Sequence, residues 1–444
     1  MFKMAHGGFV CVSRLTLIVA ASALMGSSGE ARGEGDWMQW GGPSRDFKVD
    51  CDNLAKKWPK DGPQKLWEIE LGDGYSAVSS DGKLLYAMTT KRKQLEEKKW
   101  DLEGKEAIIA LDAATGKTRW EYTYDANWEK DMQMDFGLGP HSTPLIVGDR
   151  LFAVGCMCML NCLDKNTGEL IWSKDLRKEY EAGTLAFGYS ASPLAYKDTI
   201  ILPVGGEGRG VIALKQSDGT LVWKNQDSNG THASPLLIDI DGEQHVVIFA
   251  DSGASGLNPA DGSLIWNAPH KTQWDANICT PVWCKDNILF VSSAYGNGAR
   301  GMKISKKDGK WSAEELWYNA KMKIHHGNAV VIGDYVYGSS GDFGPAFFAS
   351  VNIHTGEFGF KKRGITKATC VYGDKKLIVL DEDGRLNLAR VSPKKMKILS
   401  KCEACTKIAW TVPTLVDGTL YVRDRKVLKA FDVSDGKKTA VSVR

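Results

Sequence analysis

The sequence predicts an all-β fold, an eight-bladed β-propeller of four-stranded antiparallel blades, from three observations: a repeated phrase, its period and the turns upstream of it. The phrase is an aliphatic run, a Thr-Gly or Asp-Gly pair and a following tryptophan. It occurs in five segments, the last with four extra residues: IIALDAATGKTRW (108–120), LNCLDKNTGELIW (160–172), VIALKQSDGTLVW (211–223), ASGLNPADGSLIW (254–266) and GMKISKKDGKWSAEELW (301–317). Weaker copies follow at 348–360, 386–398 and 428–440. The turn positions recur on average about every 46 residues, which is the length of one propeller blade.

Each repeat also has an upstream half that reads as strand, Gly or Asp turn, strand. These halves are the segments 142–155, 191–205, 234–250, 280–293, 328–340 and 412–422. Together with the aliphatic run and the tryptophan strand, they give each unit four short antiparallel strands. Glycine tolerates the positive φ of a tight hairpin turn, which suits the Thr-Gly and Asp-Gly pairs. Because one such sheet cannot bury both faces, we expect the units to stack radially with the tryptophans packed between blades.

The eighth blade lacks its own fourth-strand tryptophan, since Ala440 stands in that position. The segment LWEIEL (66–71), which precedes the first blade, matches IWSKDL (171–176). We therefore expect residues 66–71 to pair into the last blade and close the ring, which removes the open sheet edges. The alternative is that the tail at 439–444 supplies this strand itself.

The N-terminus predicts export. Lys3 and Arg14 precede an apolar run, Leu15–Met25, and small residues follow it, as in a secretory signal. This run is too short to span a bilayer. The expected organisation is a signal peptide at 1–31, an N-terminal extension at 32–65 and the propeller at 66–444. The mature protein is predicted to be periplasmic or secreted and not membrane-spanning.

The charge balance does not favour a nucleic-acid partner. Lys and Arg number 57 against 54 Asp and Glu, and no basic run follows one predicted strand face. The most charged stretch, KRKQLEEKKWDLEGKE (91–106), falls between two strand patterns of the first blade. It is expected to be a solvated loop, with a protruding contact element as the alternative.

The cysteines predict at least one free thiol. Nine of the ten lie beyond Cys11 in the signal peptide, which is an odd number. Cys402 and Cys405 could close a short disulfide in an oxidising compartment. Thr406 follows them where a covalent haem motif requires histidine, so that motif is excluded.

A sulfur-rich segment, CMCMLNC (156–162), has two interpretations. Cys162 stands where sister repeats carry Ala110 and Ala213, which indicates a small residue in a strand core. The alternative is a Cu(I) site, because thioether and thiolate are soft ligands. Its ligands would come from Met132, Met134, His141, Cys156, Met157, Cys158 and Met159.

The phrase A-x-D-x-x-T-G-x-x-x-W, as in residues 110–120, resembles the tryptophan-docking motif of the pyrroloquinoline-quinone (PQQ)-like β-propellers. The opening DWMQWGGPSRD (36–46) is similar to the segment that precedes the propeller in many exported members. The resemblance covers the chain from Trp37 to its end. WD-repeat propellers fit poorly, because no aspartate follows the repeat tryptophans.

The resemblance implies two kinds of function. Some members are quinoprotein dehydrogenases that hold PQQ and Ca²⁺ in the axial channel and use an Asp as base. Others, such as the propeller subunit of the outer-membrane β-barrel assembly machinery, bind protein without a cofactor. This sequence lacks the adjacent Cys-Cys pair against which alcohol-oxidising members stack PQQ, and no Glu/Asn/Asp calcium set can be matched in it.

We therefore expect a binding or scaffold protein with a protein partner in the cell envelope, and no cofactor. The alternative is a PQQ-dependent quinoprotein oxidoreductase that holds PQQ with calcium in the central channel. A nucleic-acid partner is not expected.

Candidate site residues lie at the starts of the innermost strands, because these strands begin at the rim of the central channel. The residues are His141, Tyr189, His232, Asn277, His325, His326 and Trp410. Such a ring could hold a small polar ligand or, through its imidazoles, a metal. Alternatively, these side chains satisfy backbone groups and ordered water. No catalytic residue and no metal-ligand set is predicted, and Asp135 is the carboxylate nearest to this rim in the sequence.

Overall fold

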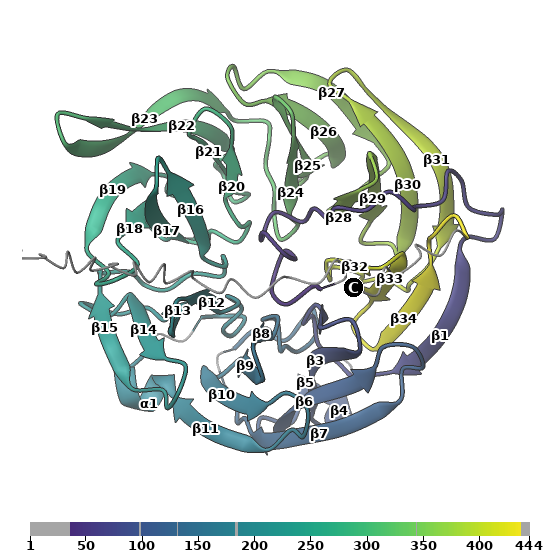
Figure 1. Cartoon of the computed structure of the whole chain (residues 1–444), viewed down its shortest axis with the longest axis horizontal. Helices are drawn as coiled ribbons and strands as arrows, with labels where there is room; N and C mark the ends of the chain where they lie inside the picture. Colours follow the sequence, from purple (N-terminus) through teal and green to yellow (C-terminus); the bar gives the residue numbers. More distant parts are fainter. Residues whose placement is uncertain (1–35, 97–98, 131, 183–184, 343, 437–444) are drawn as a thin grey trace, which may run out of the picture. The chain divides into compact units, whose positions relative to one another are not determined.

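The computed structural model describes residues 36–96, 99–130, 132–182, 185–342 and 344–436. These described residues form one compact unit. Eight four-stranded antiparallel sheets surround a common axis in this unit, which confirms the predicted eight-bladed propeller (Figure 1). The described residues contain one short helix, α1 (Leu176–Tyr180), after the second blade. None of their helices is long and apolar enough to cross a membrane.

In blades 1 to 7 the strands follow the chain from the axis outward (Figure 1). Blade 1 consists of β2 (Ser79–Ser80), β3 (Leu84–Lys91), β6 (Lys105–Asp112) and β7 (Thr118–Asp125). Blade 2 consists of β8 (Leu145–Val147), β9 (Arg150–Val154), β10 (Met159–Asp164) and β11 (Leu170–Asp175). Blade 3 consists of β12 (Leu194–Tyr196), β13 (Thr199–Pro203), β14 (Val211–Lys215) and β15 (Leu221–Asn225). Blade 4 consists of β16 (Leu236–Ile240), β17 (Glu243–Ala250), β18 (Gly253–Leu257) and β19 (Leu264–Pro269).

The second half of the ring has the same order. Blade 5 consists of β20 (Val282–Cys284), β21 (Ile288–Ser292), β22 (Ala299–Lys307) and β23 (Lys310–Asn319). Blade 6 consists of β24 (Ala329–Ile332), β25 (Tyr335–Ser340), β26 (Phe347–Asn352) and β27 (Phe358–Arg363). Blade 7 consists of β28 (Thr369–Gly373), β29 (Lys376–Leu380), β30 (Arg385–Ser392) and β31 (Lys395–Glu403). Blade 8 takes β32 (Thr414–Val416), β33 (Thr419–Arg423) and β34 (Val427–Asp432) from the end of the chain.

The outer strand of blade 8 comes from the beginning of the propeller. β1 (Gln64–Glu70) pairs antiparallel with β34, in a register that sets Trp67 opposite Ala430. This confirms the predicted closure by the segment before blade 1. The competing tail at 439–444 lies outside the described residues.

The tryptophans of the repeats pack between blades as predicted. Trp223, Trp266 and Trp317 are buried, whereas Trp120 and Trp172 are half-buried. Five of the docking indoles donate a hydrogen bond to a backbone carbonyl three residues before the turn glycine of the next blade. The pairs are Trp67 with Ala113, Trp120 with Lys165, Trp172 with Gln216, Trp223 with Pro259, and Trp317 with Ile353. The distances run from 2.7 to 3.1 Å, so β1 docks in the same way as the internal repeats.

Blade 5 departs from this pattern. Its β22–β23 hairpin projects outward from the ring (Figure 1), and Gly309 in its turn has no neighbour within 4 Å of the position a Cβ would take. Trp266 of blade 4 therefore donates instead to His245 Nδ1 in its own blade, at 3.1 Å. The extra residues seen in the fifth repeat explain both features, because they lengthen the hairpin away from the docking position.

The charged stretch at 91–106 is more ordered than the predicted solvated loop. It forms a small hairpin of β4 (Gln94–Glu96) and β5 (Lys99–Trp100) beyond β3. Residues 93–96 are exposed, but Trp100 is buried against Trp128 and Met132. The hairpin is anchored because this indole packs onto the body of the propeller.

The N-terminal extension crosses the axis of the ring and joins blades that are distant from one another (Figure 1). Trp37 pairs with Ser80 in blade 1, and the indole of Trp40 donates to Thr280 before blade 5 at 2.9 Å. The buried guanidinium of Arg45 donates to the carbonyl oxygen of Pro193 before blade 3, also at 2.9 Å. Lys48 then pairs with Tyr372 in blade 7. The segment therefore ties together both halves of the ring.

All nine cysteines in the described residues are free, so the disulfide considered between Cys402 and Cys405 is absent. Burial raises the pKa of Cys405 to about 12 and that of Cys402 to about 11, which keeps both as thiols at neutral pH.

Candidate binding site at the axis

One residue from each blade occupies the same register position just before its innermost strand. These eight residues, here called the axial ring, are Tyr75, His141, Ser190, His232, Ile278, His326, Lys367 and Trp410. Backbone-to-side-chain hydrogen bonds fix this register between neighbouring blades. For example, the amide of Thr143 donates to Ser192 Oγ and the amide of Ser192 donates to Ser234 Oγ, each at 2.9 Å.

Aromatic rings and imidazoles in half of the axial ring form a continuous stack. His141 stacks on Tyr75 with ring centroids 5.6 Å apart, and Tyr75 stacks on Trp410 at the same separation. His326 lies 4.1 Å from the indole of Trp410. Residues that are far apart in the sequence thus form one aromatic wall across blades 1, 2, 6 and 8.

Two hydrogen bonds hold histidines of the axial ring in place. His232 Nδ1 and Ser190 Oγ share a hydrogen bond of 2.7 Å. His141 donates from Nε2 to the carbonyl oxygen of Phe187 at 2.9 Å. The imidazoles are therefore held in place by the neighbouring blades.

Burial keeps the histidines neutral. Desolvation lowers the pKa of His141, His232 and His325 to about 4, and lowers that of His326 well below its ordinary value. Both ring nitrogens of His326 are buried without a hydrogen-bond partner among the described residues. These histidines are consequently neutral hydrogen-bonding and stacking groups at physiological pH.

Three carboxylates around the axial ring already have partners. Glu382 accepts a hydrogen bond from the indole of Trp410 at 3.3 Å and lies 3.9 Å from the amino group of Lys367. Asp73 pairs with Arg425. Asp342 accepts the backbone amide of Tyr295 at 2.9 Å, and Asp135 lies exposed on the loop before blade 2.

The structure brings four of the seven residues predicted from the sequence into the axial ring: His141, His232, His326 and Trp410. Tyr189 instead packs inside the hydrophobic core between blades 2 and 3. Asn277 is buried and donates to the carbonyl oxygens of Ala250 and His270, which is a structural role. His325 lies beside the ring and bonds the hydroxyl of Tyr295 at 2.5 Å.

Sequence reasoning missed Tyr75 and Lys367, and in blades 3 and 5 it selected Tyr189 and Asn277 in place of their neighbours Ser190 and Ile278. In blades 2, 3, 4, 5 and 8 the innermost strand follows a proline that marks its register, but Val78 and Cys370 replace this proline in blades 1 and 7. The signal that could have found Tyr75 was the glycine of the first hairpin turn in its blade. Gly82 lies seven residues after Tyr75, just as Gly148 lies seven residues after His141 and Gly333 seven residues after His326.

The donors at the axis do not fit a calcium ion with PQQ. Calcium prefers six to eight oxygen ligands, whereas the axial ring supplies imidazoles, aromatic rings, the hydroxyls of Tyr75 and Ser190, and one amine. The described residues hold no group of three or more His, Cys, Asp or Glu that could bind a metal. Trp410, which could have offered a face to a quinone, already stacks with Tyr75 and His326.

The sulfur-rich segment is largely enclosed by apolar side chains, with one carboxyl group beside it: Glu106 accepts the backbone amide of Cys156 at 3.2 Å. Cys156 and Met132 pack with Trp100, Trp128 and Leu138 in one small cluster. Burial raises the pKa of Cys156 well above its ordinary value, so its thiol stays protonated. Cys162 lies in the hydrophobic core between blades 2 and 3.

The fold and its docking tryptophans define the class of PQQ-like propellers, and comparison with known proteins places the chain within it. A family model described as outer membrane protein assembly factor BamB matches residues 104–362. Because this match spans more than half of the chain, the protein belongs to that family.

Curated relatives include dehydrogenases. The chain is 27% identical over 252 residues to polyvinylalcohol dehydrogenase of Pseudomonas sp, which covers 47% of this chain and 37% of that protein. It is 28% identical over 127 residues to quinoprotein alcohol dehydrogenase PedH of Pseudomonas putida, covering 28% of this chain and 20% of PedH. The matches thus span well under half the length of either relative.

Solved structures share the fold. BamB from Moraxella catarrhalis superposes with a TM-score of 0.56 at 18% identity, covering 83% of this chain and 99% of that one. Quinohemoprotein alcohol dehydrogenase from Comamonas testosteroni gives a TM-score of 0.61 at 12% identity, covering 91% and 81%. At sequence identities this low, the structural similarity supports a shared fold only.

Proposed function

We propose that this propeller is a binding or scaffold protein of the cell envelope that holds another protein at its entry face, the face where the innermost strands begin. The observation that supports this most directly is the pair of exposed aromatic side chains on loops of that face. Phe136, before blade 2, is 50% exposed and Trp274, before blade 5, is 66% exposed. Exposed aromatic groups are enriched at protein interfaces and supply much of their binding energy.

The axial ring supports the same function. Phe136 lies with its ring centroid 5.7 Å from that of Trp410, so the exposed aromatic surface continues into the ordered stack at the axis. Preorganised groups of this kind lose little side-chain entropy when a partner binds. The family description and the predicted secretory signal support the cell envelope as the place of action.

The experiment is affinity capture from the envelope fraction of the native organism, with Phe136→Glu and Trp274→Glu as test variants. Leu264→Glu is the matched control, because Leu264 is 52% exposed on the outer strand β19, away from the axis. We expect one defined partner protein to be captured by the wild type and by the control, and to be lost with either test variant. Equal capture by all four proteins would refute the entry face as the binding surface.

Oxidoreductase activity is the competing function, and the dehydrogenase relatives favour testing it. The purified protein would be mixed with PQQ and Ca²⁺ and assayed with alcohols and an artificial electron acceptor. We expect no turnover, because the axial donors do not suit the cation. Turnover that disappears with Trp410→Ala would favour the enzyme and refute the scaffold.

A further inference from the structure

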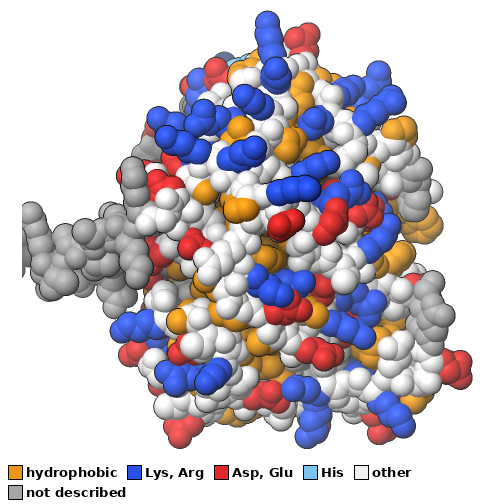
Figure 2. Space-filling model, turned by 90° about the vertical axis from the view of Figure 1, so that its right-hand side faces the viewer, with side chains coloured by type: hydrophobic (Ala, Val, Ile, Leu, Met, Phe, Trp, Pro, Cys, Tyr) orange, Lys and Arg blue, Asp and Glu red, His pale blue; other side chains and the backbone are white. Residues whose placement is uncertain are grey.

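Three segments that are distant in the sequence form a basic surface on the outside of blades 6 and 7. β27 contributes Lys362 and Arg363, β31 contributes Lys401, and the N-terminal extension contributes Lys57 and Lys60. Lys and Arg side chains predominate on the upper part of this side of the molecule (Figure 2). The chain as a whole carries a formal charge of only +3, so the positive charge here is a local feature.

These five cations are available to a partner. None of them forms an ion pair with a carboxylate in the described part of the chain, whereas the nearby Asp381 and Asp383 are both paired with Arg385. Unpaired like charges held close together repel one another, and a negative partner would relieve that repulsion.

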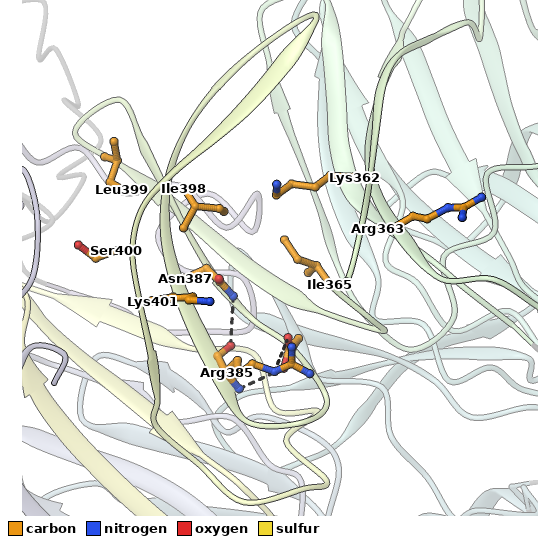
Figure 3. Close-up of a pocket in the computed structure, with 11 residues that line it drawn as sticks. Lys362, Arg363, Ile365, Arg385, Asn387, Ile398, Leu399, Ser400 and Lys401 are labelled. Atoms are coloured by element: carbon orange, nitrogen blue, oxygen red, sulfur yellow. Dashed lines mark hydrogen bonds and ion pairs between the residues drawn. The ribbon is translucent and has the colours of Figure 1, made fainter. Parts of the chain in front are cut away.

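The surface is hollowed. One hollow of about 380 Å³ lies between β27 and β31 and includes Lys362, Ile365 and Ile398 in its lining. Figure 3 shows Lys362, Ile365, Ile398 and Asn387 around this space. A second hollow of about 570 Å³ lies on the other side of β31, between that strand and residues 57–60.

Both hollows are bordered by Ser400 and Lys401, so they meet at this point of β31. Together they form what is here called the basic groove, which crosses the outermost strand of blade 7. β31 is an edge strand, paired only with β30. Edge strands are known docking places for extended peptides, whose side chains enter pockets at alternate positions.

We propose that the basic groove docks an extended acidic segment of a partner protein, one in which carboxylates alternate with apolar side chains. The cations at both ends match the carboxylates, and Ile365, Ile398 and Pro59 offer apolar contact between them. The inference rests on the proposed function insofar as both make the propeller a protein-binding scaffold, but it concerns a separate surface.

The observations favour a polypeptide over other polyanions. Single-stranded nucleic acid binds by stacking on exposed aromatic faces, and the one aromatic residue in the lining, Trp58, is buried. A lipid surface requires protruding apolar anchors, and the apolar residues here lie in hollows.

The test measures binding of a fluorescein-labelled ten-residue peptide of alternating Glu and Val by anisotropy at low and moderate salt. The test variant is Lys362→Glu with Lys401→Glu. Its control is Lys271→Glu with Lys310→Glu, which changes the net charge equally at exposed lysines outside the groove. We expect the wild type and the control to bind the peptide, and the test variant to bind it at least about tenfold more weakly.

A peptide of alternating Gln and Val, vesicles containing phosphatidylglycerol and a twenty-residue oligothymidine serve as comparison ligands. Equal binding of the Gln peptide, or equal weakening by the control variant, would overturn the proposal. So would a variant effect seen with vesicles or oligothymidine but absent with the acidic peptide. If the test variant fails to fold, Lys57→Glu with Lys60→Glu gives the same measurement from the other end of the groove.

The two proposals fail in different ways. Phe136→Glu should leave peptide binding at the groove unchanged, and Lys362→Glu with Lys401→Glu should leave the entry-face aromatics intact. If Phe136→Glu abolishes capture of the partner protein but the wild type does not bind the acidic peptide, only the groove proposal is refuted. If peptide binding depends on Lys401 but Phe136→Glu does not change capture of the partner protein, only the entry-face proposal is refuted.

Discussion

The indole nitrogen of Trp317 donates a 2.7 Å hydrogen bond to the backbone carbonyl oxygen of Ile353, in the hairpin turn of the following blade. The indole ring also covers Gly356, three residues further along that turn. One contact thus explains the repeated phrase of the sequence: the tryptophan belongs to one blade, and the glycine over which it lies belongs to the next.

The same turn explains why the phrase also contains an Asp or Asn followed three residues later by Thr. In blade 1 the carboxylate of Asp112 accepts the amide and the hydroxyl of Thr115, at 3.0 and 2.8 Å. Asp164 and Asn352 accept the amides of Thr167 and Thr355 in the same way. In each of these three turns, hydrogen bonds from its own side chains stabilise the turn, and the tryptophan of the preceding blade covers it.

The first prediction separates two constraints on the turn glycines, which are the positive φ and the contact with a tryptophan ring. Gly356 has φ of +71° and its missing Cβ would overlap the indole of Trp317, whereas Gly309 has φ of +78° with open space around it. Gly309→Ala should cost only the left-handed backbone strain of about 1–2 kcal/mol. Gly356→Ala should cost about 1–3 kcal/mol more, because the indole must also move. Equal losses in urea unfolding would show that the tryptophan does not constrain the turn.

The second prediction concerns ring closure. Trp67 of β1 is buried and its indole donates to Ala113 of blade 1 at 3.1 Å, so this residue joins the last blade to the first. Trp67→Ala should lower the free energy of unfolding by about 3–5 kcal/mol. Hydrogen exchange should accelerate first in β34, the strand that β1 covers.

Trp311→Ala is the control for closure, since Trp311 is half-buried on the projecting β23 hairpin and contacts Glu243 and His245 of blade 4, away from β1. It should cost markedly less than Trp67→Ala. If the two losses are equal, or if exchange accelerates only in blade 1, the interface made by β1 does not limit stability.

The architecture was predictable because its determinants are local in sequence. The Thr-Gly turn and the tryptophan strand of one blade lie within about thirteen residues, so their repetition identifies blades without any long-range information. Ring closure was also predictable, since residues 66–71 carry the same strand pattern as 171–176.

The site was less predictable from the sequence, because it depends on whether the side chain just before each innermost strand points toward the axis or away from it. His326 belongs to the axial ring and packs against Trp410, whereas the adjacent His325 hydrogen-bonds Tyr295. Because both residues are histidine, residue type could not distinguish them. A one-residue shift in register reverses such an assignment. The basic groove could not be predicted at all, since Lys57, Lys362 and Lys401 meet only when the ring closes and the extension folds back.

The third prediction tests the extension across the axis. The buried guanidinium of Arg45 donates to the carbonyl oxygen of Pro193, and its removal leaves that acceptor without its partner. Arg45→Met should reduce stability by about 1.5–3 kcal/mol, the usual range for a charged hydrogen bond. Arg390→Met, at an exposed position of β30, should change stability by no more than about 0.5 kcal/mol. A neutral outcome for Arg45→Met would mean that the extension does not stabilise the ring.

The fourth prediction concerns acid. The folded state holds His141 and His232 with pKa values of about 4, below the ordinary value of 6.5. Between these two pH values the unfolded chain binds protons that the folded protein does not, so stability must fall as pH falls through this window. Each histidine should contribute a slope of up to about 1.4 kcal/mol per pH unit. The stability lost on acidification should be complete only near pH 4, where the folded histidines begin to protonate.

The measurement is urea unfolding at several pH values for the wild type and for His141→Gln with His232→Gln. The double variant should show a flatter dependence between pH 6.5 and pH 4, because it no longer has two buried imidazoles to keep neutral. His354→Gln is the control, since His354 lies in an exposed turn of blade 6 beside Asp334. It should retain the wild-type slope. An unchanged slope in the double variant would mean that the histidines of the axial ring are not held neutral by burial.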